Sequence, residues 1–322
     1  MLRAITLGDA VQDIFVAGSA LHSASRDGRR IFDRLELGQK HNVEEFHNLT
    51  GGGALNVAVG LSKLGYEVSF CGALGKDAAG LALSAAMEAE DVDTSEVRWS
   101  ERYPTSTSLI LIDQFGERTI LTHRGVIDSY NWTDLDRLTE LGADVIHVTT
   151  MGKNYKILPA LFKKLAKAGV KISWNPGVRE LGHWNELKDL VPLTDVLIVN
   201  KEEARMMVEG RTLSQLARAI PGGGAVVVTD GRNGVLARDK KYEVRALEYE
   251  DAKIVDRTGA GDGFSAGFLA SYIRKGDLME AVKWGSANGN NVVKYFGATT
   301  GQLHKGARLH ELPMNVVEIE SK

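Results

Sequence analysis

Short apolar segments alternate with amphipathic segments along most of the chain. The strand-like segment 144–150 (DVIHVTT) precedes apolar positions at helical spacing over 157–165, and the strand-like segment 170–174 (VKISW) follows. This order predicts a βαβ unit. Further strands and helices of this kind are expected at 196–200, around Ala204, around Leu216 and at 225–230. Because continuous apolar strands between helices are typical of parallel sheets covered on both faces, we expect a three-layer α/β core with a mostly parallel sheet.

Two regions interrupt this alternation. Residues 105–113 (TSTSLILID) and 117–124 (ERTILTHR) flank a short QFG segment and predict an antiparallel hairpin, while the polar segment 14–48 contains only strand-like pieces. We interpret the two insertions as one small β-sheet lid. The expected division is an α/β core of 1–13, 49–104 and 125–322, with a lid of 14–48 and 105–124.

Composition and charge narrow the range of partners. The 322 residues are 43% hydrophobic and 25% charged, with a formal net charge of −3 and no basic footprint for nucleic acid. Apolar runs fall short of the roughly 18 residues needed to span a membrane, and the chain enters a strand, RAITLGD, without a signal-peptide pattern. A single cysteine, Cys71, excludes an intrachain disulfide and favours the cytoplasm. We expect small-molecule substrates or a second copy as partners.

The segment IVDRTGAGDGFSAGFLA (254–270) joins a short apolar strand to a long apolar helix. Gly259, Ala260 and Gly261 stand at the predicted helix start, where free N–H groups and a partial positive charge suit a phosphate. Asp262 follows in the first turn and could simply complement the helix dipole. A carboxylate beside an anion site would repel a phosphate, so we favour the alternative that Asp262 takes a proton from a group attacking that phosphate.

Two motifs carry a resemblance to a known family. DRTGAGDGF (256–264) resembles the C-terminal signature of the ribokinase-like, or PfkB, carbohydrate kinases, and GGGALNVAVGLSKLG (51–65) resembles their N-terminal glycine signature. The resemblance covers essentially the whole chain. It implies an α/β core with a β lid, and transfer of the γ-phosphoryl group of ATP, with Mg²⁺, to a sugar or nucleoside hydroxyl. Asp262 then matches the catalytic base, and residues 259–261 match the anion hole.

The resemblance also implies an acceptor site near the N-terminus. Asp13 in LGDAVQD matches a position that binds substrate hydroxyls, and a carboxylate is a suitable acceptor for two hydroxyl protons. Gly51, Gly52 and Asn56 match the N-terminal signature as substrate-binding positions. Taken alone, Asp13 would be a surface or turn acid and the glycines a tight loop.

The remaining matches concern nucleotide and cations. The implied nucleotide-binding residues are Asn200, Thr229, Gly231 and Asn288, and the implied metal-associated residues are Glu203, Asp256 and Thr258. Asn200 and Glu203 also form a capping-box pattern, which is compatible with water-mediated contact to Mg²⁺. Asp256 and Thr258 resemble the start of a monovalent-cation loop; its second part, near 293–301, has no obvious serine ligand, so activation by K⁺ stays open. The role of Arg257 is also open.

Other nucleotide-binding classes do not match. The first strand has no G-x-G-x-x-G turn, and GALGKD lacks the spacing of a phosphate-binding P-loop. The function predicted is therefore an ATP-dependent kinase of a small sugar, ribose-like or ketohexose-like. The alternatives are a nucleoside kinase of the same fold and a non-catalytic sugar-binding member. The segment HSASRDGRR, with Arg26, Arg29 and Arg30, extends the expected lid, through which we expect a homodimer.

Overall fold

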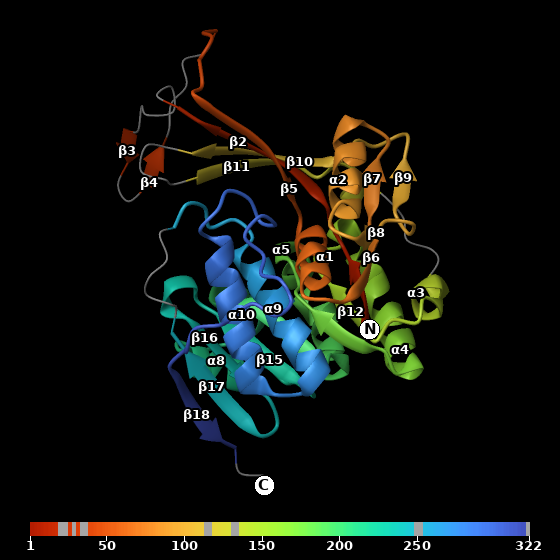
Figure 1. Cartoon of the computed structure of the whole chain (residues 1–322), viewed down its shortest axis with the longest axis vertical. Helices are drawn as coiled ribbons and strands as arrows, with labels where there is room; N and C mark the ends of the chain where they lie inside the picture. Colours follow the sequence, from red (N-terminus) through yellow and green to blue (C-terminus); the bar gives the residue numbers. More distant parts are fainter. Residues whose placement is uncertain are drawn as a thin grey trace.

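The computed structural model describes residues 1–18, 25–27, 30–32, 38–112, 118–129, 135–247 and 254–319. In these residues a ten-stranded sheet forms the centre of the molecule (Figure 1). Its strands, in spatial order, are β18 (Met314–Glu318), β17 (Tyr242–Ala246), β16 (Val235–Arg238), β15 (Ala225–Thr229), β14 (Val196–Asn200), β13 (Lys171–Trp174), β12 (Val145–Val148), β1 (Arg3–Leu7), β6 (Glu67–Cys71) and β8 (Val92–Asp93).

The strand order reverses beside β1. The seven strands from β15 to β8 pair in parallel, whereas β16, β17 and β18 add antiparallel pairs at one edge. From β1 the chain continues to β6 on one side and later to β12 on the other. In open α/β sheets, ligands bind beyond the carboxyl ends of the strands at such a switch point.

Helices cover both faces of the sheet, as the apolar pattern predicts. The α-helices are α1 (Gly53–Lys63), α2 (Ala78–Glu88), α3 (Asp136–Glu140), α4 (Leu158–Ala168), α5 (Val178–Gly182), α6 (Trp184–Leu187), α7 (Lys201–Met207), α8 (Leu213–Ala219), α9 (Ala260–Lys275) and α10 (Leu278–Val292). Short 3₁₀ turns occur at η2 (Gly125–Asp128), η3 (Gly152–Ile157), η4 (Lys188–Leu193) and η5 (Gly231–Asn233). The three-layer α/β prediction is confirmed.

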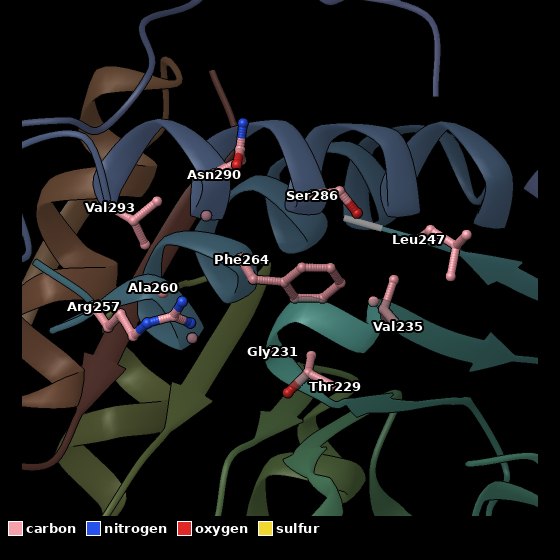
Figure 2. Close-up of a pocket in the computed structure, with 13 residues that line it drawn as sticks. Thr229, Gly231, Val235, Leu247, Arg257, Ala260, Phe264, Ser286, Asn290 and Val293 are labelled. Atoms are coloured by element: carbon pink, nitrogen blue, oxygen red, sulfur yellow. The ribbon is translucent and has the colours of Figure 1, made fainter. Parts of the chain in front are cut away.

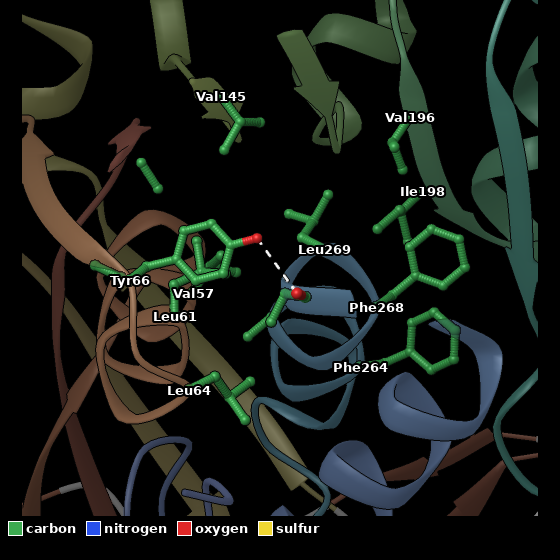
Figure 3. Close-up of a cluster of buried hydrophobic side chains, with 14 of the residues drawn as sticks. Val57, Leu61, Leu64, Tyr66, Val145, Val196, Ile198, Phe264, Phe268 and Leu269 are labelled. Atoms are coloured by element: carbon green, nitrogen blue, oxygen red, sulfur yellow. Dashed lines mark hydrogen bonds between the residues drawn. The ribbon is translucent and has the colours of Figure 1, made fainter. Parts of the chain in front are cut away.

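Successive strand residues point into two separate apolar cores. In β14, Val196 and Ile198 pack with α1, α9 and α10, whereas Leu197 and Val199 pack with α4, α7 and α8. This is the period-2 alternation of a strand buried on both faces. Figure 3 shows the first core, where the Tyr66 hydroxyl donates a 3.3 Å hydrogen bond to the carbonyl of Ala270.

A second sheet of four strands stands apart from the first at one end of the molecule (Figure 1). We call β11 (Arg118–His123), β10 (Ser106–Ile112), β2 (Val11–Ala17) and β5 (Glu45–Gly51) the second sheet. The predicted hairpin is present as the antiparallel pair of β10 and β11, and β10 pairs with β2. Strand β2 begins before residue 14 and β5 ends after residue 48, so the second sheet extends past the expected lid limits.

Two smaller strand pairs complete the architecture: β3 (Ser25–Asp27) with β4 (Arg30–Phe32), and β7 (Ala73–Gly75) with β9 (Arg98–Ser100). The side chains of Arg26, Arg29 and Arg30 lie outside the described residues. Cys71 is buried at the end of β6, where burial raises the pKa of its thiol to about 12. Among the described helices, none is long and apolar enough to cross a membrane.

Candidate active site

The candidate site lies beyond the carboxyl ends of the parallel strands. Asp9 follows β1, Thr149 follows β12, Asn200 ends β14 and Thr229 ends β15. The start of α9 faces the same crevice, since Asp262 lines it together with Asn200 and Thr229. The crevice that Asp262 lines therefore lies beyond the carboxyl ends of β13, β14 and β15.

The start of α9 has the geometry of an anion hole. Gly259 is its N-cap residue with φ of 74°, and a Cβ atom there would lie 2.6 Å from the Cα atom of Ala298. Only glycine meets both the left-handed backbone and the close packing. A Cβ atom at Gly261 would meet nothing within 4 Å, so the next turn opens into the crevice. The first N–H groups of a helix have no intrahelical acceptor and are available to a phosphate.

Asp262 stands in this first turn. Its Oδ2 accepts a 2.7 Å hydrogen bond from the side-chain amide of Asn56. Burial raises the pKa of Asp262 to about 6, and the negative charges of Asp9 and Glu203 add to the rise, while the Asn56 hydrogen bond opposes it. At neutral pH this carboxyl group is ionised but close to the pKa at which a general base works well.

The N-terminus of a second helix, α1, lies beside Asp262 as well. Gly53, the first residue of α1, lies beside Asp262, because a Cβ atom at Gly53 would come within 3.5 Å of Asp262 Oδ1. The Gly53 N–H donates a 2.9 Å hydrogen bond to Asp9 Oδ1, and the Thr149 hydroxyl donates one of 3.3 Å to the same oxygen. Burial raises the pKa of Asp9. Sequence reasoning missed Asp9, although an acid directly after the first parallel strand was the available signal.

Asp13 and two glycines lie together, as expected for the predicted acceptor side. Asp13 is only 7% exposed on β2, and burial raises its pKa to about 6 against a hydrogen bond from Ser108. A Cβ atom at Gly51 would lie 2.1 Å from Asp13 Oδ2, so the carboxylate occupies the space that a side chain would need. Gly52 has φ of 95° and approaches the Ala10 Cα atom. These glycines are explained by close backbone approach rather than by loop flexibility.

Asn56, a predicted substrate-binding residue, lies beside Asp262. It lies inside α1 with 2% exposure, and its amide donates to Asp262. Its Oδ1 atom is buried without a hydrogen-bond partner in the described structure. The structure therefore brings Asn56 to Asp262, and contact of Asn56 with a substrate stays a prediction.

Asn200 and Glu203 form the expected capping box at the start of α7. Asn200 Oδ1 accepts a 2.9 Å bond from the Glu203 N–H, and Glu203 Oε2 accepts a 2.8 Å bond from the Asn200 N–H. Both line the crevice with Asp262, and burial raises the pKa of Glu203. No group of three metal-ligating side chains exists in the described residues. Mg²⁺ is usually bound by one or two carboxylates, with waters and substrate phosphates as its other ligands. The single carboxylate of Glu203 fits this mode of binding.

A cavity of about 230 Å³ continues from the crevice (Figure 2). Val235, Leu247 and Phe264 form its apolar wall, and Arg257 lies at the opposite end from Leu247. Residues shared with the crevice are Thr229, Arg257, Ala260 and Gly261. Thr229 and Gly231, both predicted to bind nucleotide, line this cavity, and Arg257 lines both the cavity and the crevice.

Asn288 is not on the cavity wall in the described structure. Its amide donates 2.7 Å bonds to the Gly263 carbonyl and to Gln302 Oε1, and its Oδ1 accepts from the Leu303 N–H. On α10 it is Ser286, Gly289 and Asn290 that line the cavity. Adjacent helix positions differ by about 100° in direction, so Asn288 turns toward Gly263 and Gln302 while Ser286 and Asn290 turn toward the cavity.

The loop before α9 holds Asp256 and Thr258, the expected cation ligands. Asp256 Oδ1 accepts from the Thr258 N–H at 2.9 Å and from its hydroxyl at 2.8 Å, while Oδ2 accepts from the Gly297 N–H at 3.1 Å. The guanidinium of Arg118 lies 3.4 Å from Asp256 Oδ1 and 2.6 Å from Thr258 Oγ1. Because a cationic side chain already faces both groups, these residues do not fit a bound K⁺. Sequence reasoning missed Arg118.

Comparisons with known proteins agree with this geometry. The pfkB family carbohydrate kinase profile matches residues 12–305. An uncharacterised sugar kinase of Archaeoglobus fulgidus is 30% identical over 249 residues, covering 76% of this chain and 98% of that protein. A nucleoside kinase of Methanocaldococcus jannaschii is 26% identical over 257 residues, covering 78% of this chain and 81% of that protein.

The fold has solved counterparts as well. The structure of Arabidopsis thaliana ribokinase complexed with ribose and ATP superposes with a TM-score of 0.77 at 21% identity, covering 94% of this chain and 96% of that chain. At that identity the likeness shows the fold. The match of the family profile over most of the chain shows the class: the protein belongs to the pfkB family of carbohydrate kinases, phosphotransferases that use an alcohol group as acceptor.

Proposed function

We propose that this protein is an ATP-dependent kinase that transfers the γ-phosphoryl group to a hydroxyl of a small sugar. The observation that carries the proposal is Asp262, a carboxylate with a pKa of about 6 in the first turn of α9. The glycine-framed helix start supplies N–H groups for phosphate oxygens, and the carboxylate beside it supplies a proton acceptor. If Asp262 only complemented the helix dipole, it would need neither burial nor a hydrogen bond from Asn56.

The chemistry follows from these positions. Asp262 accepts the proton of the attacking hydroxyl, the new bond forms between that oxygen and the γ-phosphorus, and the bond to the leaving ADP oxygen breaks. The N–H groups of residues 259–261 stabilise charge on the transferred group. Glu203 is the residue that would hold Mg²⁺ through waters, and the ion would supply further neutralisation of the phosphates. Asp13 accepts hydroxyl protons of the sugar and orients it.

The nucleotide assignment rests on the cavity beside α9. Its apolar wall of Val235, Leu247 and Phe264 suits a flat base, and its polar end at Thr229 leads to the anion hole. This order puts the phosphates at the helix start and the base between α10 and β16. We also propose a cytoplasmic location, since the one cysteine, Cys71, is a buried free thiol.

We further propose that the second sheet covers the acceptor and pairs with a second copy. Its outer strands carry exposed apolar side chains: Phe46 on β5 is 61% exposed, and Ile120 and Leu121 on β11 are 51% and 55% exposed. An exposed apolar edge favours association. Sedimentation at micromolar concentration, with and without substrate, tests the pairing; a monomer in both conditions would contradict it.

Release of ADP from ATP and Mg²⁺, measured with a panel of pentoses, ketohexoses and nucleosides, tests the function. We expect turnover with a sugar and its loss in Asp262→Asn. Turnover with nucleosides alone would favour the nucleoside kinase alternative, which the relative from M. jannaschii exemplifies. Binding of a sugar without turnover by any panel member would favour a non-catalytic sugar-binding protein.

A further inference from the structure

The loop that leads into the anion hole depends on one buried carboxylate. Asp256 is 8% exposed and bonds three groups of its own surroundings: the Thr258 N–H, the Thr258 hydroxyl and the Gly297 N–H. These bonds join the loop before α9 to the segment that contains Gly297. The next residue of that segment, Ala298, packs against the N-cap residue Gly259. A displaced Asp256 would therefore displace the first turn of α9.

Hydrogen bonds and a positive partner both offset the cost of burying a carboxylate. In the described structure the ion-pair partner of Asp256 is Arg118, which is 34% exposed. Arg118 is the first residue of β11, an outer strand of the second sheet, 138 positions earlier in the chain. Its Nη1 also donates to Thr258 Oγ1 at 2.6 Å, so a single guanidinium group contacts two residues of the loop.

We propose that Arg118 is a positioning residue that supplies the positive charge at Asp256 in place of a monovalent cation and ties the second sheet to the anion hole. The inference rests on the proposed kinase function. It has two consequences. The enzyme works without K⁺, because the charge that K⁺ would bring is covalently part of the chain. The second sheet and the loop before α9 also hold each other in position.

The test compares Arg118→Met with the wild-type protein. Methionine keeps much of the side-chain length and removes the charge and the donors. The matched control is Arg102→Met, since Arg102 is exposed and stacks on Tyr103 away from the loop. Turnover, ATP affinity and melting temperature are measured in potassium, sodium and choline chloride at equal ionic strength.

We expect wild-type and Arg102→Met to give the same turnover and the same ATP affinity in all three salts. In choline, Arg118→Met loses affinity for ATP and turnover by about tenfold or more, as expected for a charge-assisted hydrogen bond. Guanidinium or K⁺ added to this variant restores part of both, because each brings a cation back to Asp256. A residue that only stabilises the fold would not respond to the identity of the cation.

Three results would overturn the proposal: strong stimulation of the wild-type protein by K⁺, unchanged ATP affinity of Arg118→Met in choline, or a loss in that variant that no cation restores. If Arg118→Met does not fold, Arg118→Lys and Arg118→Gln make the comparison, and only the lysine variant should keep ATP affinity in choline. ATP binding is read by calorimetry independently of turnover. Absence of turnover with every acceptor would therefore refute the kinase function while leaving the role of Arg118 tested.

Discussion

The side-chain amide of Asn56 donates a 2.7 Å hydrogen bond to the carboxylate of Asp262. This bond joins the N-terminal glycine signature to the C-terminal one across 206 positions of sequence. A hydrogen bond to the ionised form of a carboxyl group lowers its pKa, so Asn56 moderates the rise that burial imposes on the base. One half of the chain thus adjusts the proton affinity of a group that the other half supplies.

Asp262→Asn tests the base directly. The amide keeps the side-chain shape but cannot accept the proton, so we expect turnover to fall by about 10²- to 10⁴-fold. ATP affinity should be retained or increased, because the carboxylate no longer repels the γ-phosphate. Turnover, ATP dissociation constant and melting temperature are measured on the same preparation. Turnover within about threefold of wild type would refute the assignment.

The pH dependence of kcat/KM reports the pKa of the base. With a pKa of about 6, Asp262 is protonated and inactive at lower pH, so kcat/KM should fall as the pH drops below about 6. Asn56→Ala removes the hydrogen bond that favours the ionised form, so the acid limb should move to higher pH by about one unit. Unchanged ATP affinity serves as the control. An acid limb at the same pH in both proteins would contradict the coupling.

Gly51→Ala tests the predicted acceptor side without replacing a charged residue. The added Cβ atom would lie 2.1 Å from Asp13 Oδ2, so the carboxylate must move. We expect KM for the sugar to rise by about tenfold or more, the scale of a lost charge-assisted hydrogen bond, with little change in ATP affinity. Gly182→Ala is the matched control, because a Cβ atom there meets nothing within 4 Å. Equal weakening of sugar and ATP binding would assign Gly51 a structural role.

Asp13→Asn should stabilise the fold in a pH-dependent manner. Burial raises the pKa of Asp13 from 3.8 to about 6, so the native state binds its proton more tightly than the unfolded state does. Above pH 6 the ionised carboxylate therefore lowers the free energy of unfolding, by up to about 3 kcal/mol. The asparagine variant removes this penalty. Its gain should be complete near pH 8, shrink as the pH falls through 6 and vanish below about pH 4.

Denaturant unfolding at several pH values measures this gain. The exposed Asp189 provides the control, since Asp189→Asn should change stability little at any pH. A gain for Asp13→Asn that does not vary between pH 8 and pH 4 would show that ionisation is not its cause.

The core strands and the start of α9 were predictable because local pattern determines them. Continuous apolar runs such as 196–200 need burial on both faces, and the glycines at 259 and 261 mark a helix start whatever lies around it. The pairing of β10 with β11 also followed from short-range alternation. These features depend on neighbours within about ten residues, a distance over which sequence periodicity is readable.

Contacts between distant segments were not predictable in the same way. Arg118 lies in the alternating sequence ERTILTHR, and nothing in its neighbourhood indicates an ion pair with Asp256. Asn288 was assigned to the cavity by motif position, whereas the rotation of α10 about its axis turns Ser286 and Asn290 there. The position of Asp9 just after β1 was predictable from the sequence, but its hydrogen bond from the Gly53 N–H depends on how α1 packs.

The position of the anion hole late in the chain has a consequence for synthesis. The acceptor carboxylate Asp13 and the helix α1 are made first, whereas Gly259–Gly261 and Asp262 lie in the last quarter of the sequence. Domains form as they emerge from the ribosome, N-terminus first. Because α1 packs against α9 in one core, the first βα units reach their final packing only after α9 has been made. Until then a nascent chain lacks both the proposed phosphate-binding N–H groups and the proposed proton acceptor.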